Sequence, residues 1–182
     1  MSVTTLDPAT ALIVVDLQAA LAGMPTVHPL DDVVANAAKL ADAFRAKQLP
    51  VVLVNVAGGA PGRTEQGAIG SAFPDGWTDL LPQLKQQPSD KTVTKYTWGA
   101  FHNTDLAEHL NKLGVTQAVV VGVATSLGVE STARQAYEHG LHVTVATDAV
   151  TDSNPEAHHN SVTRIFPMLG ETGTTNNILA LL

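Results

Sequence analysis

Short apolar runs alternate along the chain with segments in which apolar residues recur at helical spacing. The runs are apolar or β-branched, and runs of this length are typical of strands buried within a sheet. They lie at residues 11–16, 51–55, 91–95, 117–122 and 142–147.

Helical patterns fill most of the intervals between these runs. In residues 31–47 apolar side chains recur every three or four positions, and Asp31 stands where a helix N-cap is expected. Further helices are expected at residues 106–113, 128–139 and 155–168, and a short strand or turn followed by a helix at 172–182. This alternation predicts an α/β fold, a three-layer, doubly wound sandwich with a mostly parallel sheet of about six strands.

The domain organisation follows from length and from the absence of repeats. The 182 residues contain no internal repeat or low-complexity tract, and we expect one domain spanning residues 1–182. Residues 57–90 are rich in glycine and proline and show little periodicity. In a compact domain, such a stretch indicates a substrate-covering loop rather than an inert linker.

Composition excludes several classes of function. The chain has no cysteine, which excludes disulfides, thiolate metal sites and cysteine nucleophiles. A net charge of −7, with 17 acidic and 10 basic residues, argues against a nucleic-acid-binding surface. No apolar run is long enough for a membrane span, and Met1 to Pro8 does not resemble a secretory signal. We therefore expect a cytoplasmic protein.

Three features fall at the carboxyl ends of the predicted strands, where doubly wound sheets bind ligands. Asp16 ends an apolar strand, where an ionised carboxylate is costly unless paired, and Lys95 ends another strand. The third feature is the turn at residues 122–130, which contains Gly128. Backbone N–H groups at such a helix start can hold an anion or a developing oxyanion. A purely structural Asp16–Lys95 ion pair and a packing role for Gly128 stay open from these residues alone.

A set of short motifs covers almost the whole chain. In order they are Val15-Asp-Leu-Gln18, Lys95 with Trp98-Gly-Ala-Phe101, Gly122-Val-Ala-Thr125, Val129-Glu-Ser-Thr-Ala133, and Thr147-Asp-Ala149 with Asp152. Together they resemble the isochorismatase-like hydrolase superfamily, which includes isochorismatases, nicotinamidases and other amide hydrolases. The resemblance implies the three-layer fold, a homo-oligomer of at least two chains, and a cis peptide bond between Val123 and Ala124.

The resemblance also implies roles for individual residues. Cysteine-dependent members use an aspartate as general base, a lysine that positions and stabilises, and a nucleophilic cysteine. By position, Asp16 and Lys95 match the first two, whereas Gly128 stands at the nucleophile position, so thioester chemistry is excluded there. True isochorismatases also lack that cysteine and hydrolyse a vinyl ether without a covalent intermediate. They carry a histidine in the turn where this chain has Thr125-Ser126.

We therefore expect a cofactor-free hydrolase of a small anionic molecule. Asp16 is the candidate acid, Lys95 its partner, and the N–H groups of Ala124 and Gly128 a candidate oxyanion hole. Burial raises the pKa of such a carboxyl and a nearby lysine lowers it, and the sequence does not decide between them. A catalytically inactive binding protein and an amidase that uses water or Ser126 are the alternatives.

Five further side chains are candidates for substrate contact or chemistry. Gln18 lies two residues after Asp16, and Arg63 lies in the long loop, where it can clamp a carboxylate or simply be solvated. Trp98 and Phe101 either wall the pocket or pack in the core. Ser126 is a substitute nucleophile, although no histidine is evidently placed to activate it and turn serines usually bond their own backbone.

A metal site is not expected. Metal-dependent nicotinamidases carry an Asp-x-His motif after the second strand, and this chain has Asn55-Val-Ala57 there. His158 and His159 are adjacent on a predicted helix and therefore point to different faces. The remaining histidines do not show ligand-like spacing.

Overall fold

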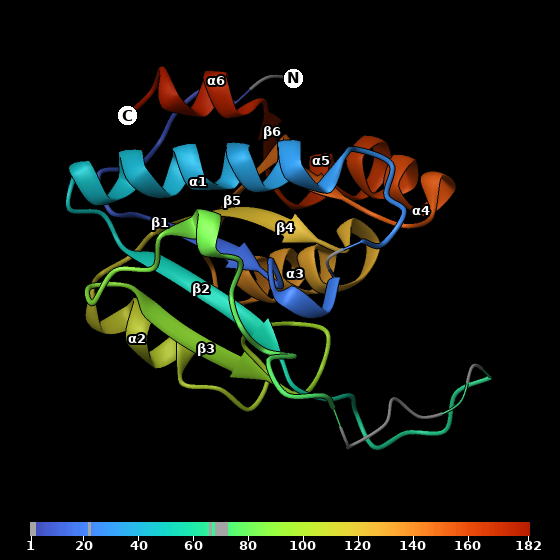
Figure 1. Cartoon of the computed structure of the whole chain (residues 1–182). Coiled ribbons are helices and arrows are strands. Elements are labelled where there is room, and N and C mark those ends of the chain that lie inside the picture. Colours follow the sequence, from blue (N-terminus) through green and yellow to red (C-terminus); the bar gives the residue numbers. More distant parts are fainter. Residues whose placement is uncertain (1–2, 22, 66, 68–72) are drawn as a thin grey trace.

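The sheet predicted from the apolar runs forms the centre of the molecule. The computed structural model describes residues 3–21, 23–65, 67 and 73–182, and in them six strands pair in the order β3-β2-β1-β4-β5-β6, all parallel (Figure 1). The strands are β1 (Thr10–Val15), β2 (Val51–Val56), β3 (Lys91–Lys95), β4 (Gln117–Val123), β5 (His142–Thr151) and β6 (Glu171–Gly173). The strand order reverses direction between β1 and β4, which creates a topological switch point at their carboxyl ends.

Helices cover both faces of this sheet (Figure 1). Helices α1 (Leu30–Ala46) and α6 (Thr175–Leu179) close one apolar cluster, whereas α2 (Leu106–Lys112), α3 (Glu130–Glu138) and α5 (Phe166–Leu169) close the other. The central strand β1 is buried along its whole length and contributes alternate residues to the two clusters. This arrangement confirms the three-layer α/β prediction. Of the helices in the described residues, none is both long and apolar enough to cross a bilayer.

The first helix begins differently from the prediction. Helix α1 starts at Leu30 after Pro29, and Asp31 lies inside the first turn instead of capping it. The side chain of Asp31 makes no cap hydrogen bond, so its predicted N-cap role is wrong. Its charge is still favourable there, because the N-terminal turn of a helix carries partial positive charge.

Two of the predicted helices are interrupted by wider, π-helical turns. The segment 128–139 becomes the π-turn η3 (Thr125–Val129) followed by α3. The segment 155–168 becomes α4 (Pro155–Asn160), the π-turn η4 (Ser161–Ile165) and α5. Pro167 explains the second interruption, since proline has no N–H to donate and its ring clashes with the carbonyl one turn earlier.

Strand β5 runs four residues further than the pattern predicted. The polar pair Thr147-Asp148 interrupts the apolar run, and the register against β4 shifts between Val120 and Gly122. Asp148 is nevertheless accommodated, because its Oδ1 accepts hydrogen bonds from the N–H and the hydroxyl of Thr175 at 2.6 and 2.9 Å. The longer strand carries the chain to Asp152, beside the turn that follows β4.

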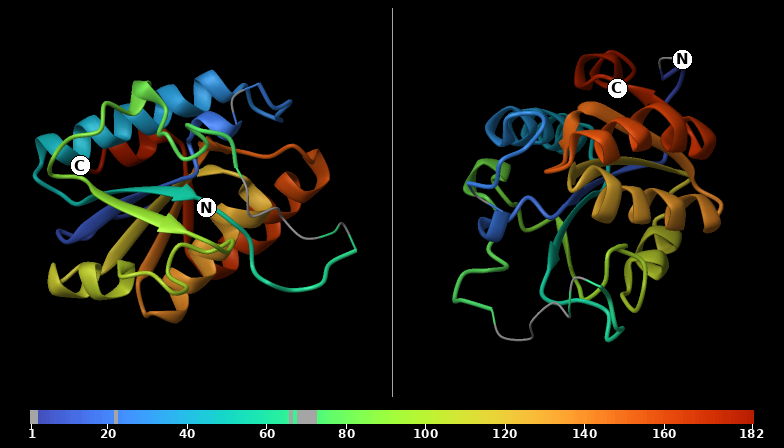
Figure 2. Two further views of the ribbon diagram at one scale, coloured as in Figure 1. Left: turned by 60° about the horizontal axis from the view of Figure 1, so that its bottom comes forward. Right: turned by 90° about the vertical axis from the view of Figure 1, so that its right-hand side faces the viewer.

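The described part of the long loop after β2 divides into two halves. Residues 57–65 leave the end of β2 and extend away from the sheet and helices (Figures 1 and 2). The returning half is fastened to the end of β2, because the indole N–H of Trp77 donates to the Val56 carbonyl at 3.1 Å. This second half lies against the carboxyl edge of the sheet, and the first half contacts that edge at its start, where the Ala57 N–H donates to the Lys95 carbonyl at 2.9 Å.

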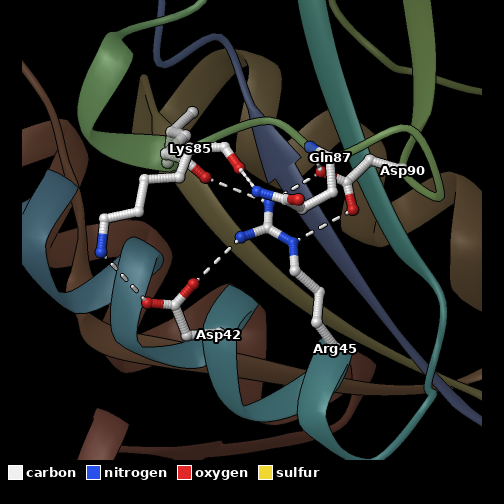
Figure 3. Close-up of polar contacts among 6 residues, drawn as sticks. Asp42, Arg45, Lys85, Gln87 and Asp90 are labelled. Atoms are coloured by element: carbon white, nitrogen blue, oxygen red, sulfur yellow. Dashed lines mark hydrogen bonds and ion pairs between the residues drawn. The ribbon is translucent and has the colours of Figure 1, made fainter.

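A buried arginine fixes the segment that leads into β3 (Figure 3). Arg45, near the end of α1, donates two hydrogen bonds to the carboxylate of Asp90, at 3.1 and 2.7 Å. The same guanidinium donates to the Leu84 carbonyl at 3.0 Å and to Asp42 at 3.1 Å. The Asp90 side chain is only 1% exposed. Because Asp90 immediately precedes β3, this contact sets the position of the strand that ends in Lys95.

Candidate active site

Asp16 lies one residue beyond β1, at the switch point of the sheet. Strict alternation would place its side chain on the α1 face with Leu12 and Val14. Asp16 instead adopts φ 53°, a left-handed conformation that non-glycine residues rarely take. Its carboxylate reaches Lys95, which lies on the opposite face.

Lys95 is directed inward by the alternation along β3. This strand is at the edge of the sheet and buries Val93 and Lys95 while exposing Thr92 and Thr94. Val93 belongs to the cluster under α2 and α3, so the Lys95 side chain lies on that same face. It is 2% exposed.

The two charges form a close, buried pair. Lys95 Nζ lies 2.7 Å from Asp16 Oδ2 and donates a second hydrogen bond to the Thr97 carbonyl at 3.1 Å. The other carboxylate oxygen, Asp16 Oδ1, is buried and has no hydrogen-bond partner in the described residues. A buried polar atom without a partner is costly, so this oxygen is open to a bound molecule.

The environment of this pair raises the pKa of the Asp16 carboxyl. Burial raises the pKa of Asp16 from 3.8 to about 6, against the opposing effects of the charge and hydrogen bond of Lys95. The sequence left open whether burial or Lys95 has the larger effect on the pKa of Asp16. In the structure, burial has the larger effect. Near neutral pH, part of the Asp16 population carries a proton, as a general acid requires.

The turn after β4 lies directly against Asp16. A Cβ atom at Gly128 would lie 3.1 Å from Asp16 Oδ2, from the Val123 carbonyl oxygen and from a methyl of Val15. Gly128 is therefore the residue of the turn that faces the carboxylate, and the contact is so close that a Cβ would fit only if its neighbours shifted by a few tenths of an ångström. The Val123–Ala124 peptide bond just before the turn is cis, which confirms that expectation.

Ser126 bonds Asp152 and not the Asp16–Lys95 pair. Its N–H and its hydroxyl both donate to Asp152 Oδ2 at 2.8 Å, and within the described ranges no histidine contacts its Oγ. The structure therefore shows Ser126 as a turn residue fastened to Asp152. Thr125 contacts His158, with 2.9 Å between Oγ1 and Nδ1. The sequence analysis missed the contacts of His158 with the turn, and only the quoted motif around Asp152 pointed to this region.

Two other candidates have roles outside the pair. Both ends of the Gln18 amide bond the backbone: its Oε1 accepts from Val56 N–H at 2.7 Å, and its Nε2 donates to the carbonyls of Val56 and Trp77. Phe101 is 7% exposed, belongs to the core cluster and stacks on His139, so it does not line the site.

Trp98 and Arg63 are exposed. Trp98 is 56% exposed and lines a cavity of about 340 Å³ together with Ser131 and Thr97, whose carbonyl accepts the Lys95 hydrogen bond. Arg63 lies on the half of the long loop that extends away from the sheet. Of these two, Trp98 alone lines the cavity that includes Thr97.

The residues at the position of the nicotinamidase metal motif do not fit a metal. Asn55 donates through Nδ2 to the Thr78 carbonyl at 3.0 Å, and Val56 and Ala57 offer no side-chain ligand. In the described part of the chain, no three His, Cys, Asp or Glu side chains gather in a metal-binding arrangement. His158 is buried and His159 exposed, so the two point to different faces as predicted.

Comparisons with known proteins agree with this fold. The isochorismatase domain model matches residues 10–177. The isochorismatase family protein YwoC of Bacillus subtilis is 38% identical over 177 residues, covering 93% of this chain and 92% of YwoC. Nicotinamidase 3 of Arabidopsis thaliana is 32% identical over 157 residues, covering 81% of this chain and 76% of that protein.

A solved structure agrees over the whole length. An isochorismatase family protein from Burkholderia thailandensis superposes with a TM-score of 0.93 at 40% identity, covering 100% of this chain and 99% of that one. The match of sequence and fold covers almost the whole chain. The chain therefore belongs to the isochorismatase family of hydrolases.

Proposed function

We propose that the protein hydrolyses a small anionic molecule without a cysteine nucleophile, with Asp16 as acid and base and Lys95 as its partner. The proposal rests on one observation, that the two oxygens of the Asp16 carboxylate have different surroundings. Oδ2 is held by Lys95, whereas Oδ1 is buried and has no partner in the described residues. The proton of the neutral form therefore belongs on Oδ1, where only a bound molecule can receive it.

A substrate carboxylate favours the protonated form of Asp16. An anion that binds beside Lys95 competes with Asp16 for the positive charge and weakens the effect that lowers the pKa of Asp16. The carboxyl then holds its proton more firmly until the reaction needs it. The lysine thus selects for an anionic substrate and links its binding to the protonation of the acid.

Vinyl-ether hydrolysis matches a single acid of this kind. Asp16 Oδ1 gives its proton to the terminal vinyl carbon, and the π electrons form the new C–H bond and leave an oxocarbenium ion. Water adds to that ion, and its proton passes back to the Asp16 carboxylate. The resulting hemiketal separates into a ketone and an alcohol, so the acid is regenerated and no covalent enzyme intermediate forms.

Gly128 is consistent with this route. The position offers no side chain for attack, so this route needs no nucleophile from the turn. In this proposal the N–H groups of Ala124 and Gly128 bind substrate oxygens, and Trp98 and Arg63 contact its more distant parts. No cofactor is needed for any step, and the protein acts as a homo-oligomer.

Amide hydrolysis by directly activated water is the second candidate, favoured by the similarity to a nicotinamidase over most of the chain. In that reaction Asp16 in its ionised form accepts a proton from water that attacks the carbonyl. Ser126 is a poor alternative nucleophile because both its N–H and its hydroxyl are bonded to Asp152. A protein that binds such molecules without turnover is the remaining alternative.

The test is turnover of isochorismate and of a panel of amides and ureides. We expect release of pyruvate from isochorismate, and loss of that activity by at least about a hundredfold in Asp16→Asn and Lys95→Ala. Lys112→Ala, on an exposed helix face, keeps the activity of the wild type, and Ser126→Ala lowers the activity far less than the loss of a nucleophile would. Full activity in Asp16→Asn, or turnover of amides alone, would contradict the vinyl-ether assignment.

A further inference from the structure

The turn that faces Asp16 is held in place by side chains from another part of the fold. No side chain of the turn caps its N-terminus. Its first two residues instead bond the segment between β5 and α4: Thr125 contacts His158, and Ser126 contacts Asp152. Gly128, which contacts the Asp16 carboxylate, is only two residues after Ser126 and three after Thr125.

Asp152 is buried, and its carboxylate accepts two hydrogen bonds from this turn. It is 3% exposed, and in the described residues no lysine or arginine forms an ion pair with it. Its Oδ2 accepts both hydrogen bonds from Ser126, and its Oδ1 accepts from the N–H of Asn154 at 3.0 Å. Removing these donors would leave a buried charge without partners, so the carboxylate holds the turn firmly.

His158, on helix α4, makes the other side-chain contact with the turn, through Thr125. It is 8% exposed, and the ring of His28 meets it edge-on with 4.9 Å between centroids. Burial is the largest cause that lowers the pKa of His158; His28 and His159 lower it further, and Asp152 raises it. The ring is therefore neutral near pH 7, and Nδ1 and the Thr125 hydroxyl form an uncharged hydrogen bond in either direction.

We propose that His158 and Asp152 are positioning residues of the active site, which act through Thr125 and Ser126 to hold Gly128 against the Asp16–Lys95 pair. The proposal deepens the proposed function and rests on it, because the pair is the centre whose geometry the two residues maintain. Neither residue has a contact with Asp16 or Lys95 in the described residues, so neither is a catalytic residue.

A single introduced thiol can report this geometry without knowledge of the substrate. The chain has no cysteine, so Gly128→Cys places one unique thiol beside Asp16 Oδ2 and Lys95. The pH dependence of its alkylation by iodoacetamide gives the thiol pKa. We expect a value below the 8.5 of free cysteine, because the amides of the turn and the lysine favour the thiolate.

The positioning variants are then made in this Gly128→Cys background. Thr125→Val removes the hydroxyl at nearly constant shape, and His158→Leu removes the ring nitrogen, so both loosen the turn. We expect both to move the thiol pKa towards 8.5 by at least about one unit. His158→Asn keeps a polar atom near the place of Nδ1 and restores the value of the parent. The neighbouring exposed residue provides the matched control, His159→Asn, which leaves the value unchanged.

The possible results separate this proposal from the proposed function. A thiol pKa that is unchanged in both Thr125→Val and His158→Leu would overturn the positioning roles, even if Asp16→Asn abolishes turnover. A parent thiol that titrates near 8.5 would overturn them as well, because the turn would not be held against the pair. If His158→Leu fails to fold, Thr125→Val alone decides, since it removes the same hydrogen bond from the other side.

Discussion

The raised pKa of Asp16 predicts an unusual dependence of stability on pH. The folded protein holds a proton on this carboxyl up to about pH 6, whereas the unfolded chain releases it near 3.8. The contribution of Asp16 to stability is therefore fully present below the lower value and is lost as the pH rises through the higher one. The loss between pH 4 and pH 8 amounts to about 2–3 kcal/mol. Asp16 thus lowers the stability of the folded protein above about pH 6, where its buried carboxyl is ionised.

The assay is urea unfolding at fixed protein concentration from pH 4 to pH 8, for the wild type and for Asp16→Asn/Lys95→Met. The double variant removes both charges, so no buried lysine is left without a partner. All other titrating groups are shared, and their effects cancel in the difference between the two proteins. We expect the wild type to lose about 2–3 kcal/mol relative to the variant as the pH rises. A difference that is constant, or that moves in favour of the wild type, would show that Lys95 outweighs burial.

Two further predictions concern other parts of the molecule. Arg45→Met leaves the buried carboxylate of Asp90 without its guanidinium and should lower the free energy of unfolding by about 3–5 kcal/mol, measured by urea titration. Arg134→Met, which breaks a more exposed pair, should cost less than about 1 kcal/mol, and equal losses in the two variants would refute the argument. The homo-oligomer predicted from the family resemblance should sediment at two or more times 19.0 kDa at micromolar concentration, and a mass near 19.0 kDa would contradict it.

The sequence predicts the architecture because strand ends are visible in it. Apolar or β-branched runs that stop at a charged residue locate the carboxyl edge of a parallel sheet, and this places Asp16 and Lys95 at the same edge. The bounds of β3 are predicted without error because Lys91 and Lys95 enclose an alternating strand. The end of β5 is predicted four residues too early, because Asp148 interrupts the apolar pattern. The hydrogen bonds that accommodate Asp148 come from Thr175, which lies 27 residues later in the chain.

The finer geometry of the site depends on features that a linear pattern does not contain. Period-two alternation directs Asp16 to the face opposite Lys95, and only its positive φ brings the two together. Whether Phe101 lines the pocket or packs in the core depends on a stacking contact with His139 from a distant helix end. The role of His158 likewise depends on a distant contact, because its partner Thr125 lies 33 residues earlier in the chain. Each of these is a tertiary contact, and no local pattern of residues encodes it.

The two glycines that bracket the turn show how structural and functional constraints differ. Gly122 has φ +121°, and a Cβ there would collide with the backbone of Val15, so the close approach of β4 to β1 requires glycine at that position. Gly128 lacks such a positive φ, and the nearest atoms to its missing Cβ, at 3.1 Å, include a carboxylate oxygen and a methyl that can shift by a few tenths of an ångström. The backbone therefore tolerates a side chain at position 128 far better than at 122. Glycine at position 128 nevertheless lets the turn lie close to the Asp16 carboxylate, because a Cβ there would press on that oxygen and on the Val123 carbonyl oxygen, each at 3.1 Å.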